Sequence, residues 1–377
     1  MKKRRQQWKI YFVICLSWLI LSVTGCTPVQ QTQQPVLEST AVKGELTIHF
    51  LDVGEGNATL IESEGKYMLI DGGVNAKSSY VVAYLKKQGI ESLNYVIATH
   101  YDADHLAGVV GVLHVFPVET IIGPQYSTDT KIYRSFMEQL SAHDYTLISP
   151  DVGDEYQMGD ITFTVVGPAR YGHTDENDDS VAVRIRHGDN SFLIAGDAGA
   201  ESEQEIAESG VHLKSDVYLV NHHGSETSTT QEFLDLVDPE YAVISSGTEG
   251  NNYGHPRKAV LDRLQQKDVK LFRTDIQGEV IVTSDGTGLS FSQEPCNDFT
   301  PGGEGTTSEN TQATAEDTTA VISEEGATYI LNTSSRKFHL PDCQAVENMK
   351  DKNKSYFTGT KEEAIENGYD PCGWCLP

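Results

Sequence analysis

Basic residues are scarce in this chain of 377 residues. Only 28 Lys and Arg stand against 55 Asp and Glu, which gives a formal net charge of −27 at pH 7. Without residues 1–25, which hold five bases and no acid, the charge is −32. Such a surface repels nucleic acid on average. We therefore expect an anionic substrate only where bound divalent cations reverse the local charge.

Cysteines and long apolar runs are also few. The four cysteines that follow residue 26 are Cys296, Cys343, Cys372 and Cys375. They are too few for a disulfide scaffold in a chain of this size. No apolar run after Val23 is long enough to cross a membrane, which argues against a DNA channel. The hydrophobic content of 38% is that of an ordinary globular protein.

The N-terminus has the pattern of a secretory signal. Four basic residues among the first five precede an apolar stretch over 10–23, and Val23-Thr24-Gly25-Cys26 follows. A cysteine at this junction resembles a bacterial lipobox, which implies a lipid anchor on Cys26 at the outer face of the cytoplasmic membrane. The alternative is an uncleaved transmembrane anchor, and the short apolar length argues against it.

Two changes of composition divide the rest of the chain. Residues 26–43 are rich in Gln, Thr and Pro and predict a tether behind the signal peptide of residues 1–25. Residues 295–326 hold seven acids and no base, and predict a disordered linker. We therefore expect two folded units, a large domain over 44–294 and a small module over 327–377.

The large unit alternates short β-branched runs with amphipathic stretches, which predicts a layered α/β architecture. The predicted strands are 46–53, 58–62, 67–70, 95–98, 161–166, 181–185, 191–195, 217–220, 241–244, 269–272 and 279–282. The predicted helices are 81–88, 132–142, 201–209, 231–237 and 257–266.

The most informative segment is T-H-Y-D-A-D-H-L-A-G at residues 99–108. It places His100, Asp102, Asp104 and His105 directly behind the apolar run of residues 95–98. A surface salt-bridge cluster would normally include Lys or Arg, and this segment holds neither. We predict a metal site on a strand-to-helix loop.

Four further predicted strands end in potential ligands. These are Asp71 in D-G-G, Asp197 in G-D, the pair His222 and His223 in H-H-G-S, and His255 in G-H-P. Each motif alone is more often a turn or a helix cap. Their ordered occurrence behind a dense ligand motif points to one shared centre.

This ordered set resembles the metallo-β-lactamase superfamily, and more narrowly the hydrolase domain of ComEC-type competence proteins of DNA uptake. The resemblance covers about residues 45–290 and implies a four-layered αββα fold with two divalent metal ions between the sheets. It implies that His100 and Asp102 bind one ion, that Asp104 and His105 bind the other, and that Asp197 bridges them. His255 fits the late histidine ligand.

Two positions depart from the superfamily pattern. Asp102 stands where a histidine is usual, and its harder oxygen widens the choice of metal from zinc towards manganese. The third-motif histidine has no clear counterpart, and His173, Asp178 or Asp179 is the candidate contributor. The pair His222 and His223 would place one imidazole at the metals and one towards the substrate, in either order.

A binuclear centre of this kind activates water and polarises a phosphoryl or carbonyl oxygen. We expect Asp104 to orient that water, and His222 or His223 to protonate the leaving oxygen. The first expectation is a phosphodiesterase or nuclease acting on DNA outside the cytoplasm. The alternatives are a hydrolase of cell-envelope esters, such as teichoic acid phosphocholine, and a non-catalytic binding protein on the same fold.

The other polar residues of these motifs have structural interpretations. Asp71 is expected to hold a turn or a ligand histidine rather than to touch metal, and Asp52 to be internal support. The basic group nearest a proposed ligand, Arg257, Lys258 and Arg263, is best explained as a solvated helix face. Five histidines lack ligand-type spacing and are expected to be ordinary residues: His49, His114, His143, His187 and His212.

The small unit has its own ligand pattern. His339, Cys343, Cys372 and Cys375 lie on about fifty residues that can hardly build a core unaided. A structural zinc would stabilise the module, which is similar to the Ada-type metal-binding domain although His339 stands where that domain has cysteine. The alternative is a disulfide between two of the three cysteines, because the expected compartment is oxidising.

Overall fold

The computed structural model describes residues 44–247 and 253–302, and in the C-terminal part 327–333, 335–339, 343, 346, 349–359 and 369–372. The predicted signal peptide, the tether with Cys26, most of the linker and Cys375 lie outside the described residues. Within the described ranges, no helix combines the length and the apolar character that a membrane span requires.

The first sheet, sheet A, has eight strands in the order β15-β14-β1-β2-β3-β4-β5-β6. Its strands are β1 (Leu46–Phe50), β2 (Thr59–Ser63), β3 (Lys66–Ile70), β4 (Leu93–Ile97), β5 (Val118–Ile122), β6 (Leu147–Ile148), β14 (Val280–Ser284) and β15 (Leu289–Phe291). β3, β4, β5 and β6 are parallel neighbours, whereas β1, β2, β14 and β15 pair antiparallel.

The second sheet, sheet B, has seven strands in the order β13-β12-β11-β10-β9-β8-β7. Its strands are β7 (Glu155–Met158), β8 (Ile161–Gly167), β9 (Ala182–His187), β10 (Asn190–Ile194), β11 (Val217–Leu219), β12 (Tyr241–Ile244) and β13 (Lys270–Arg273). β10 to β13 are parallel, and β7, β8 and β9 extend the sheet antiparallel.

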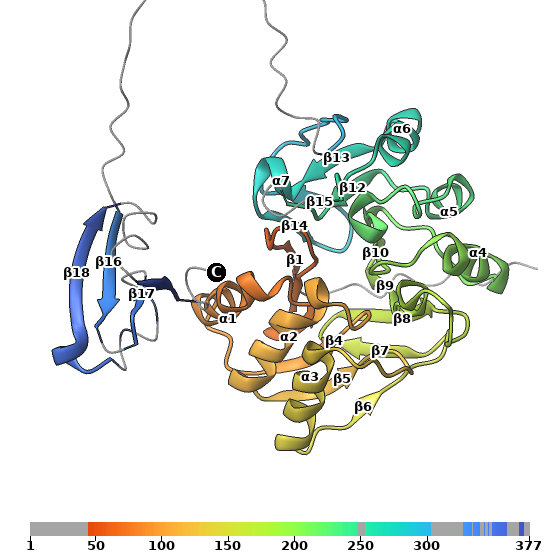
Figure 1. Cartoon of the computed structure of the whole chain (residues 1–377). Coiled ribbons are helices and arrows are strands. Elements are labelled where there is room, and N and C mark those ends of the chain that lie inside the picture. The colour runs from red at the N-terminus through yellow and green to blue at the C-terminus, as the bar shows by residue number, and fades with distance from the viewer. Residues whose placement is uncertain are drawn as a thin grey trace, which may run out of the picture. The chain divides into compact units, whose positions relative to one another are not determined.

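The two sheets pack face to face, and helices cover their outer faces (Figure 1). The helices are α1 (Ser78–Lys87), α2 (Ala103–Val115), α3 (Lys131–Ala142), α4 (Ala200–Ser209), α5 (Gln231–Val237), α6 (Lys258–Gln266) and the short α7 (Thr274–Gln277). Helices α1 to α3 lie on sheet A, and α4 to α6 lie on sheet B.

Three apolar layers hold this arrangement together. Strand residues that alternate inward, such as Phe50 from sheet A and Phe163 from sheet B, fill the space between the sheets. Separate clusters join sheet A to α1–α3 and sheet B to α4–α6. Complete burial of one such side chain contributes roughly 1.5–3 kcal/mol. The four-layered αββα fold is therefore confirmed.

Glycines bring α2 close to the end of β3. A Cβ atom at Gly108 of α2 would collide with the carbonyl of Gly72, which follows β3. The backbone N–H of Gly72 donates to the carbonyl of His105 at 2.7 Å, and that of Gly108 donates to Gly73 at 3.3 Å. These contacts fix the first turn of α2, which carries the central ligand motif, against the sheet.

The domain continues past the boundary expected at residue 294. Within the described part of the predicted linker, the Asn297 amide donates to the Leu271 carbonyl at 3.1 Å, and the Gly302 amide donates to the Pro256 carbonyl at 2.8 Å. Arg273, only 3% exposed, donates to the carbonyls of Asp298 and Thr300. Residues 297–302 thus belong to the edge of the domain beside β13.

The C-terminal part forms a separate small sheet of order β18-β16-β17-β19. Its strands are β16 (Ala327–Asn332), β17 (Lys337–His339), β18 (Lys354–Gly359) and β19 (Asp370–Pro371). The apolar cluster of this sheet is small, with Tyr329, Leu331 and Phe338 as its buried members.

Candidate metal centre

The ligand-type residues of the large domain gather where parallel strands end. His100 follows β4, and α2 then begins with Asp104 and His105 in its first turn. From sheet B, Asp197 follows β10, and His223 lies in the short 3-10 turn Asn221–Gly224 after β11. Because both sheets present the carboxyl ends of their parallel strands here, residues far apart in sequence meet at one point.

Four of these residues form the centre of the cluster. Asp104, His105, Asp197 and His223 offer ligand atoms that all lie within 4.8 Å of one another. The Nε2 atom of His105 lies 3.1 Å from Oδ1 of Asp197, and Nε2 of His223 lies 3.4 Å from Oδ2 of the same carboxylate. Asp104 Oδ2 is 3.6 Å from Nε2 of His223.

The hydrogen bonds of the two central histidines define their tautomers. His105 Nδ1 donates to Oδ2 of Asp71 at 2.8 Å, and His223 Nδ1 donates to the backbone carbonyl of Ser245 at 2.9 Å. Each neutral ring therefore keeps the lone pair on Nε2, yet the two Nε2 atoms face each other at 3.2 Å. Two lone pairs at this separation repel, and a proton or a cation beside them removes the conflict.

The carboxylates give this centre a strong affinity for positive charge. Burial disfavours a charge on His223, but Asp197 and Asp104 outweigh that effect and raise its pKa to about 10. Burial would likewise raise the pKa of Asp104, but His223 and His105 lower it to about 2. The field around the cluster therefore favours cations and ionised carboxylates.

Two more histidines adjoin Asp197 with unpaired ring nitrogens. His100 is fully buried, its Nε2 atom has no hydrogen-bond partner among the described residues, and it lies 3.9 Å from Oδ2 of Asp197. Burial and the neighbouring His105 lower the pKa of His100 to about 4, so its ring is neutral. His222 Nε2 lies 3.6 Å from the same carboxylate oxygen, and 22% of the His222 side chain is exposed.

This donor set fits divalent cations. Neutral imidazole nitrogens with exposed lone pairs, mixed with ionised carboxylates, are the ligands of zinc and of manganese-type ions. The unpaired Nε2 of buried His100 is costly unless something binds it. A cation beside His105 and His223 also separates their two lone pairs.

His255 reaches the same place from the loop after β12. Its ring centroid lies 5.8 Å from that of His222 and 6.2 Å from that of His223. Its Nδ1 donates to Oε1 of Glu55 at 2.7 Å, so the carboxylate orients the ring from the far side. Sequence analysis missed Glu55, because no ligand-type spacing marks it.

Asp71 has the supporting position that its sequence context predicts. Fully buried, it accepts hydrogen bonds from the backbone and hydroxyl of Thr99, from His105 Nδ1 and from Asn57 Nδ2. Four donors saturate its two oxygens and leave it as a holder of His105. Asp52 similarly accepts from the Gly54 amide at 3.3 Å.

The remaining predicted ligands do not join the four-residue cluster. Asp102 precedes α2, and its side chain is exposed. Burial and the charge of Asp104 raise its pKa to about 6, which reflects proximity without contact. It remains a predicted ligand at the rim of the centre.

The three candidates for the third-motif position face elsewhere. His173 Nδ1 lies 2.6 Å from Asp179 Oδ1, and its Nε2 lies 3.3 Å from Glu205. Asp178 accepts hydrogen bonds from the amides of Gly199 and Ser202 at the start of α4. Their polar atoms are therefore used to hold the segment 172–180 on α4, while Ser180 Oγ, also missed from sequence, accepts from the Asp197 amide at 3.2 Å.

The histidine pair lies on a strained backbone. His222 and His223 have φ angles of 51° and 55°, the left-handed region that costs a residue with a Cβ atom roughly 1–2 kcal/mol. Two such residues in succession persist only where the surrounding structure imposes them. This backbone turns His223 inward onto Asp197, while 22% of the His222 side chain stays exposed.

The basic residues beside His255 form no open groove. Lys258 pairs with Asp262 one turn further along α6, and Arg263 donates to the carbonyls of Ser228 and Thr229. Arg257 is exposed. The interpretation as a solvated helix face fits Arg257 and Lys258, whereas Arg263 is half-buried and binds the backbone of Ser228 and Thr229.

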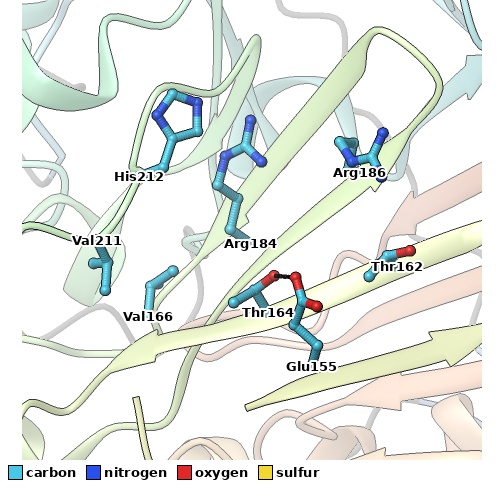
Figure 2. A pocket seen from close by; sticks show the side chains of 8 residues that line it. All are labelled: Glu155, Thr162, Thr164, Val166, Arg184, Arg186, Val211 and His212. Atoms are coloured by element: carbon cyan, nitrogen blue, oxygen red, sulfur yellow. Dashed lines mark hydrogen bonds between the residues drawn. The ribbon is translucent and has the colours of Figure 1, made fainter. Parts of the chain in front are cut away.

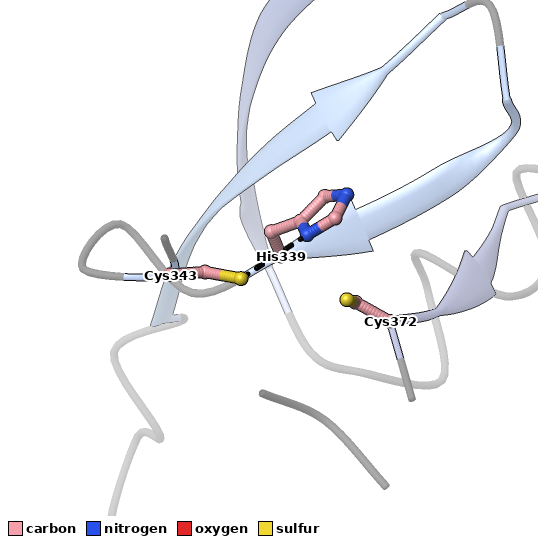
Figure 3. Close-up of side chains that lie close together, drawn as sticks. All are labelled: His339, Cys343 and Cys372. Atoms are coloured by element: carbon pink, nitrogen blue, oxygen red, sulfur yellow. Dashed lines mark hydrogen bonds between the residues drawn. The ribbon is translucent and has the colours of Figure 1, made fainter. Parts of the chain in front are cut away.

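A second cluster of metal-ligand type lies in the C-terminal module (Figure 3). The ligand atoms of buried His339, Cys343 and Cys372 lie within 4.8 Å of one another. His339 Nδ1 is 3.4 Å from the Cys343 sulfur. Cys375, the fourth predicted ligand, lies outside the described residues.

Comparison with known proteins identifies the large domain. Residues 51–248, more than half of the chain, match the model of the metallo-beta-lactamase superfamily. The chain belongs to this superfamily. The cluster of histidines and carboxylates between the two sheets agrees with the divalent-metal sites that this superfamily carries.

Several curated proteins are similar to the chain. It is 26% identical to ComE operon protein 3 of Bacillus subtilis over 63% of this chain and 33% of that protein. It is 29% identical to competence protein ComA of Neisseria gonorrhoeae, over 69% of this chain and 34% of ComA. It is 32% identical to recombination protein 2 of Haemophilus influenzae, over 62% of this chain and 28% of that protein. The match thus spans about a third of the length of these relatives.

Solved structures also resemble it. The metallo-beta-lactamase fold protein YhfI of Bacillus subtilis aligns over 64% of this chain and all of its own, with 13% identity and a TM-score of 0.44. Igni18, a metallo hydrolase of Ignicoccus hospitalis, aligns over 63% of this chain and 98% of its own, with 18% identity and a TM-score of 0.44.

Proposed function

We propose that this protein is an exported, lipid-anchored hydrolase that uses two divalent metal ions to cleave phosphodiesters of DNA outside the cytoplasm. The observation that carries the proposal is the pair of Nε2 lone pairs on His105 and His223, held 3.2 Å apart beside the ionised Asp197. A cation beside Asp197 separates the two lone pairs and takes up the negative charge of the carboxylates. Relatives named as a competence protein and a recombination protein support DNA as the substrate.

The ligand atoms suggest two overlapping sets. Asp104, His105 and His223 would hold one ion, and His100 with Asp102 and His255 would contribute to the other. Asp197 lies between the sets: its Oδ1 faces His105, whereas its Oδ2 faces His223, His100 and His222. When bound, the ions supply a reactive hydroxide near neutral pH and neutralise charge on the phosphoryl oxygen.

The protein side chains provide orientation and proton transfer. Asp104, half-buried and ionised, accepts a hydrogen bond from the attacking water and orients it. The exposed 22% of the His222 side chain is accessible to substrate, whereas only 4% of the His223 side chain is exposed. We therefore assign protonation of the leaving oxygen to His222 and metal binding to His223.

The decisive experiment uses the full chain, solubilised in mild detergent and supplied with zinc or manganese. Bound metal is measured first, followed by hydrolysis of bis-p-nitrophenyl phosphate, single- and double-stranded DNA, and phosphocholine esters. We expect turnover of the diester and of DNA, with losses of at least about a hundredfold in Asp104→Asn and Asp197→Asn. Asp129→Asn, a change at an exposed carboxylate that pairs with Arg134, is the matched control.

Each outcome separates the alternatives. Turnover confined to phosphocholine esters would replace DNA by a cell-envelope substrate. Metal binding without any turnover would favour a binding protein on this fold. If the chain bound no metal ion, or bound as much in Asp197→Asn as in the wild type, the proposal would be wrong. Palmitate labelling that is lost in Cys26→Ala tests the lipid anchor separately.

We also propose a structural zinc ion in the C-terminal module. Three soft or borderline donors, His339, Cys343 and Cys372, meet in a buried position, and Cys375 in C-x-x-C would complete the set. Burial lowers the pKa of His339, which favours the neutral ring that binds metal. The apolar cluster of Tyr329, Leu331 and Phe338 is too small to stabilise the module alone, so we expect the ion to supply most of its stability.

Cobalt substitution tests this second site directly. Thiolate-to-cobalt absorption is expected in the full chain and is expected to weaken in Cys343→Ser, while Cys296→Ser, outside the module, leaves it unchanged. Thiol counting of the denatured, unreduced chain provides the counter-test, because a disulfide between two of the module cysteines would overturn the zinc proposal.

A further inference from the structure

A pocket of about 260 Å³ lies on the outer face of sheet B, away from the metal centre's ligands. Its lining residues are Glu155, Thr162, Thr164, Val166, Arg184, Arg186, Val211 and His212. Figure 2 shows the two arginines, which are alternate residues of β9, on the same side as the threonines of β8. The proposed mechanism uses none of these residues.

The alternation of β8 and β9 explains why polar side chains gather here. Phe163, Val165 and Ile185 point into the core between the sheets, so the residues between them point outward. The register pairs Thr162 with Arg186 and Thr164 with Arg184. A band of hydroxyl and guanidinium groups therefore covers this end of the outer face.

The pocket lining holds two arginines and one carboxylate, so the lining itself carries a net positive charge in a strongly acidic protein. Arg186 is exposed and forms no ion pair with any described carboxylate, unlike Arg134 or Arg170, which pair with acids. Arg184 is held by a hydrogen bond from its Nε to the carbonyl of Lys214 at 2.8 Å. Burial, Arg184 and Lys214 lower the pKa of His212, as expected next to other cations.

Two carboxylates lie near the pocket, and both have other partners. Glu155 Oε1 accepts a hydrogen bond from the Thr164 hydroxyl at 3.4 Å. Asp216, which partly offsets the charge of Arg184, accepts from the amide and hydroxyl of Ser191 at 2.7 and 2.9 Å. Neither forms an ion pair with Arg186, whose guanidinium therefore stays available to a ligand.

We propose that this pocket binds a phosphate group of the DNA strand whose cleavage we assign to the metal centre. Guanidinium and hydroxyl groups are typical partners of phosphate oxygens. The lining holds no Phe, Tyr or Trp on which a base could stack, so the backbone rather than the base is recognised. The volume lies below the range of about 300–1,000 Å³ that is usual for larger ligands.

The position along β9 suits a strand that leaves the centre. Val181, just before β9, donates its amide to the Thr99 carbonyl beside His100. At about 3.3 Å per residue, Arg184 and Arg186 lie roughly 10 and 17 Å further along the strand. The DNA assignment rests on the proposed function, whereas the phosphate assignment does not.

The test uses the full chain without metal, so that binding is measured in the absence of cleavage. Anisotropy of a labelled single-stranded oligonucleotide is compared between the wild type, Arg186→Glu and Arg134→Glu, which change the net charge equally. We expect about tenfold weaker binding in Arg186→Glu, with a smaller salt dependence, and no change in Arg134→Glu. Arg186→Gln should give a smaller loss in the same direction.

Inorganic phosphate and a polyglycerol phosphate are tested in parallel. Phosphate binding that weakens in Arg186→Glu while DNA binding does not would overturn the DNA assignment, as would an effect confined to polyglycerol phosphate. Equal affinities of the wild type, Arg186→Glu and Arg134→Glu for every ligand would overturn the pocket itself. Failure of the wild type to hydrolyse bis-p-nitrophenyl phosphate with metal would instead count against the proposed function, and the metal-free binding result would still stand.

Discussion

Oδ2 of Asp71 accepts a hydrogen bond from Nδ1 of His105 at 2.8 Å, and this single contact decides which nitrogen of His105 faces the cluster. Both residues are fully buried, so water does not compete for the bond. Asp71 lies outside the cluster, yet its hydrogen bond to Nδ1 leaves Nε2 of His105 as the nitrogen that faces the cluster.

Asp71→Asn should weaken metal binding without removing a ligand. The amide keeps the size of the side chain but loses the charge that makes His105 a stronger donor, so we expect a loss of about 10- to 100-fold in metal affinity. Competition against a chromogenic chelator measures it. Asp52→Asn, where the side chain only accepts from the Gly54 amide, serves as control. Unaltered affinity in Asp71→Asn would contradict the supporting role.

The two neighbouring histidines should respond differently to the same substitution. In His222→Gln we expect normal metal content with kcat reduced by about 10²- to 10⁴-fold, because a proton donor is lost. In His223→Gln we expect reduced metal content, because a buried donor beside Asp197 is lost. Elemental analysis together with steady-state kinetics distinguishes them, and the reverse pattern would exchange the two assignments.

Gly108→Ala should destabilise the domain although alanine is the better helix former. The new methyl group meets the carbonyl of Gly72, which backbone contacts hold in place, and we expect a cost of about 1–3 kcal/mol in the free energy of unfolding. Gly111→Ala on the same helix meets only the rotatable Ser78 hydroxyl, so its cost should be smaller. Urea unfolding of both variants checks the order, and equal stabilities would contradict it.

The buried Glu203 should make stability fall as pH rises. Burial raises its pKa from 4.5 to about 7, despite hydrogen bonds from Asn221, Thr229 and Thr230. The folded state therefore holds a proton that the unfolded state has lost between these pH values. The contribution is complete below pH 4.5 and is lost by about pH 7, with an upper limit of roughly 3 kcal/mol.

Urea unfolding from pH 4.5 to 7.5 measures this effect as the difference between the wild type and Glu203→Gln. We expect the stability advantage of the wild type to shrink with rising pH, because glutamine cannot titrate. Glu208→Gln at the exposed end of the same helix supplies the baseline. A difference independent of pH would show that Glu203 keeps one protonation state throughout.

The sequence predicts the layered fold and the strand ends that carry ligands, because β-branched runs followed by Asp or His are local signals. It predicts α2 poorly, since every residue from Leu106 to Leu113 is apolar or glycine, and such a run shows no helical period. The edge strands β6, β7 and β15 are short or polar, and a single sequence gives them little weight.

The partners of the ligands are harder to predict than the ligands. Glu55 orients His255 from 200 positions away in the chain, and the Ser245 carbonyl orients His223 without using its side chain. Such relationships arise only from the packing of the two sheets. Likewise, His212 is an ordinary histidine by its spacing, and only the register of β8 and β9 reveals the cations around it.

The split origin of the cluster has a consequence for how the protein matures. His100, Asp104 and His105 come from the half of the chain that builds most of sheet A, while Asp197 and His223 come from the half that builds sheet B. Neither half alone offers a complete coordination sphere. Under the proposed function, the two ions are therefore expected to bind only after sheet A and sheet B have packed against each other.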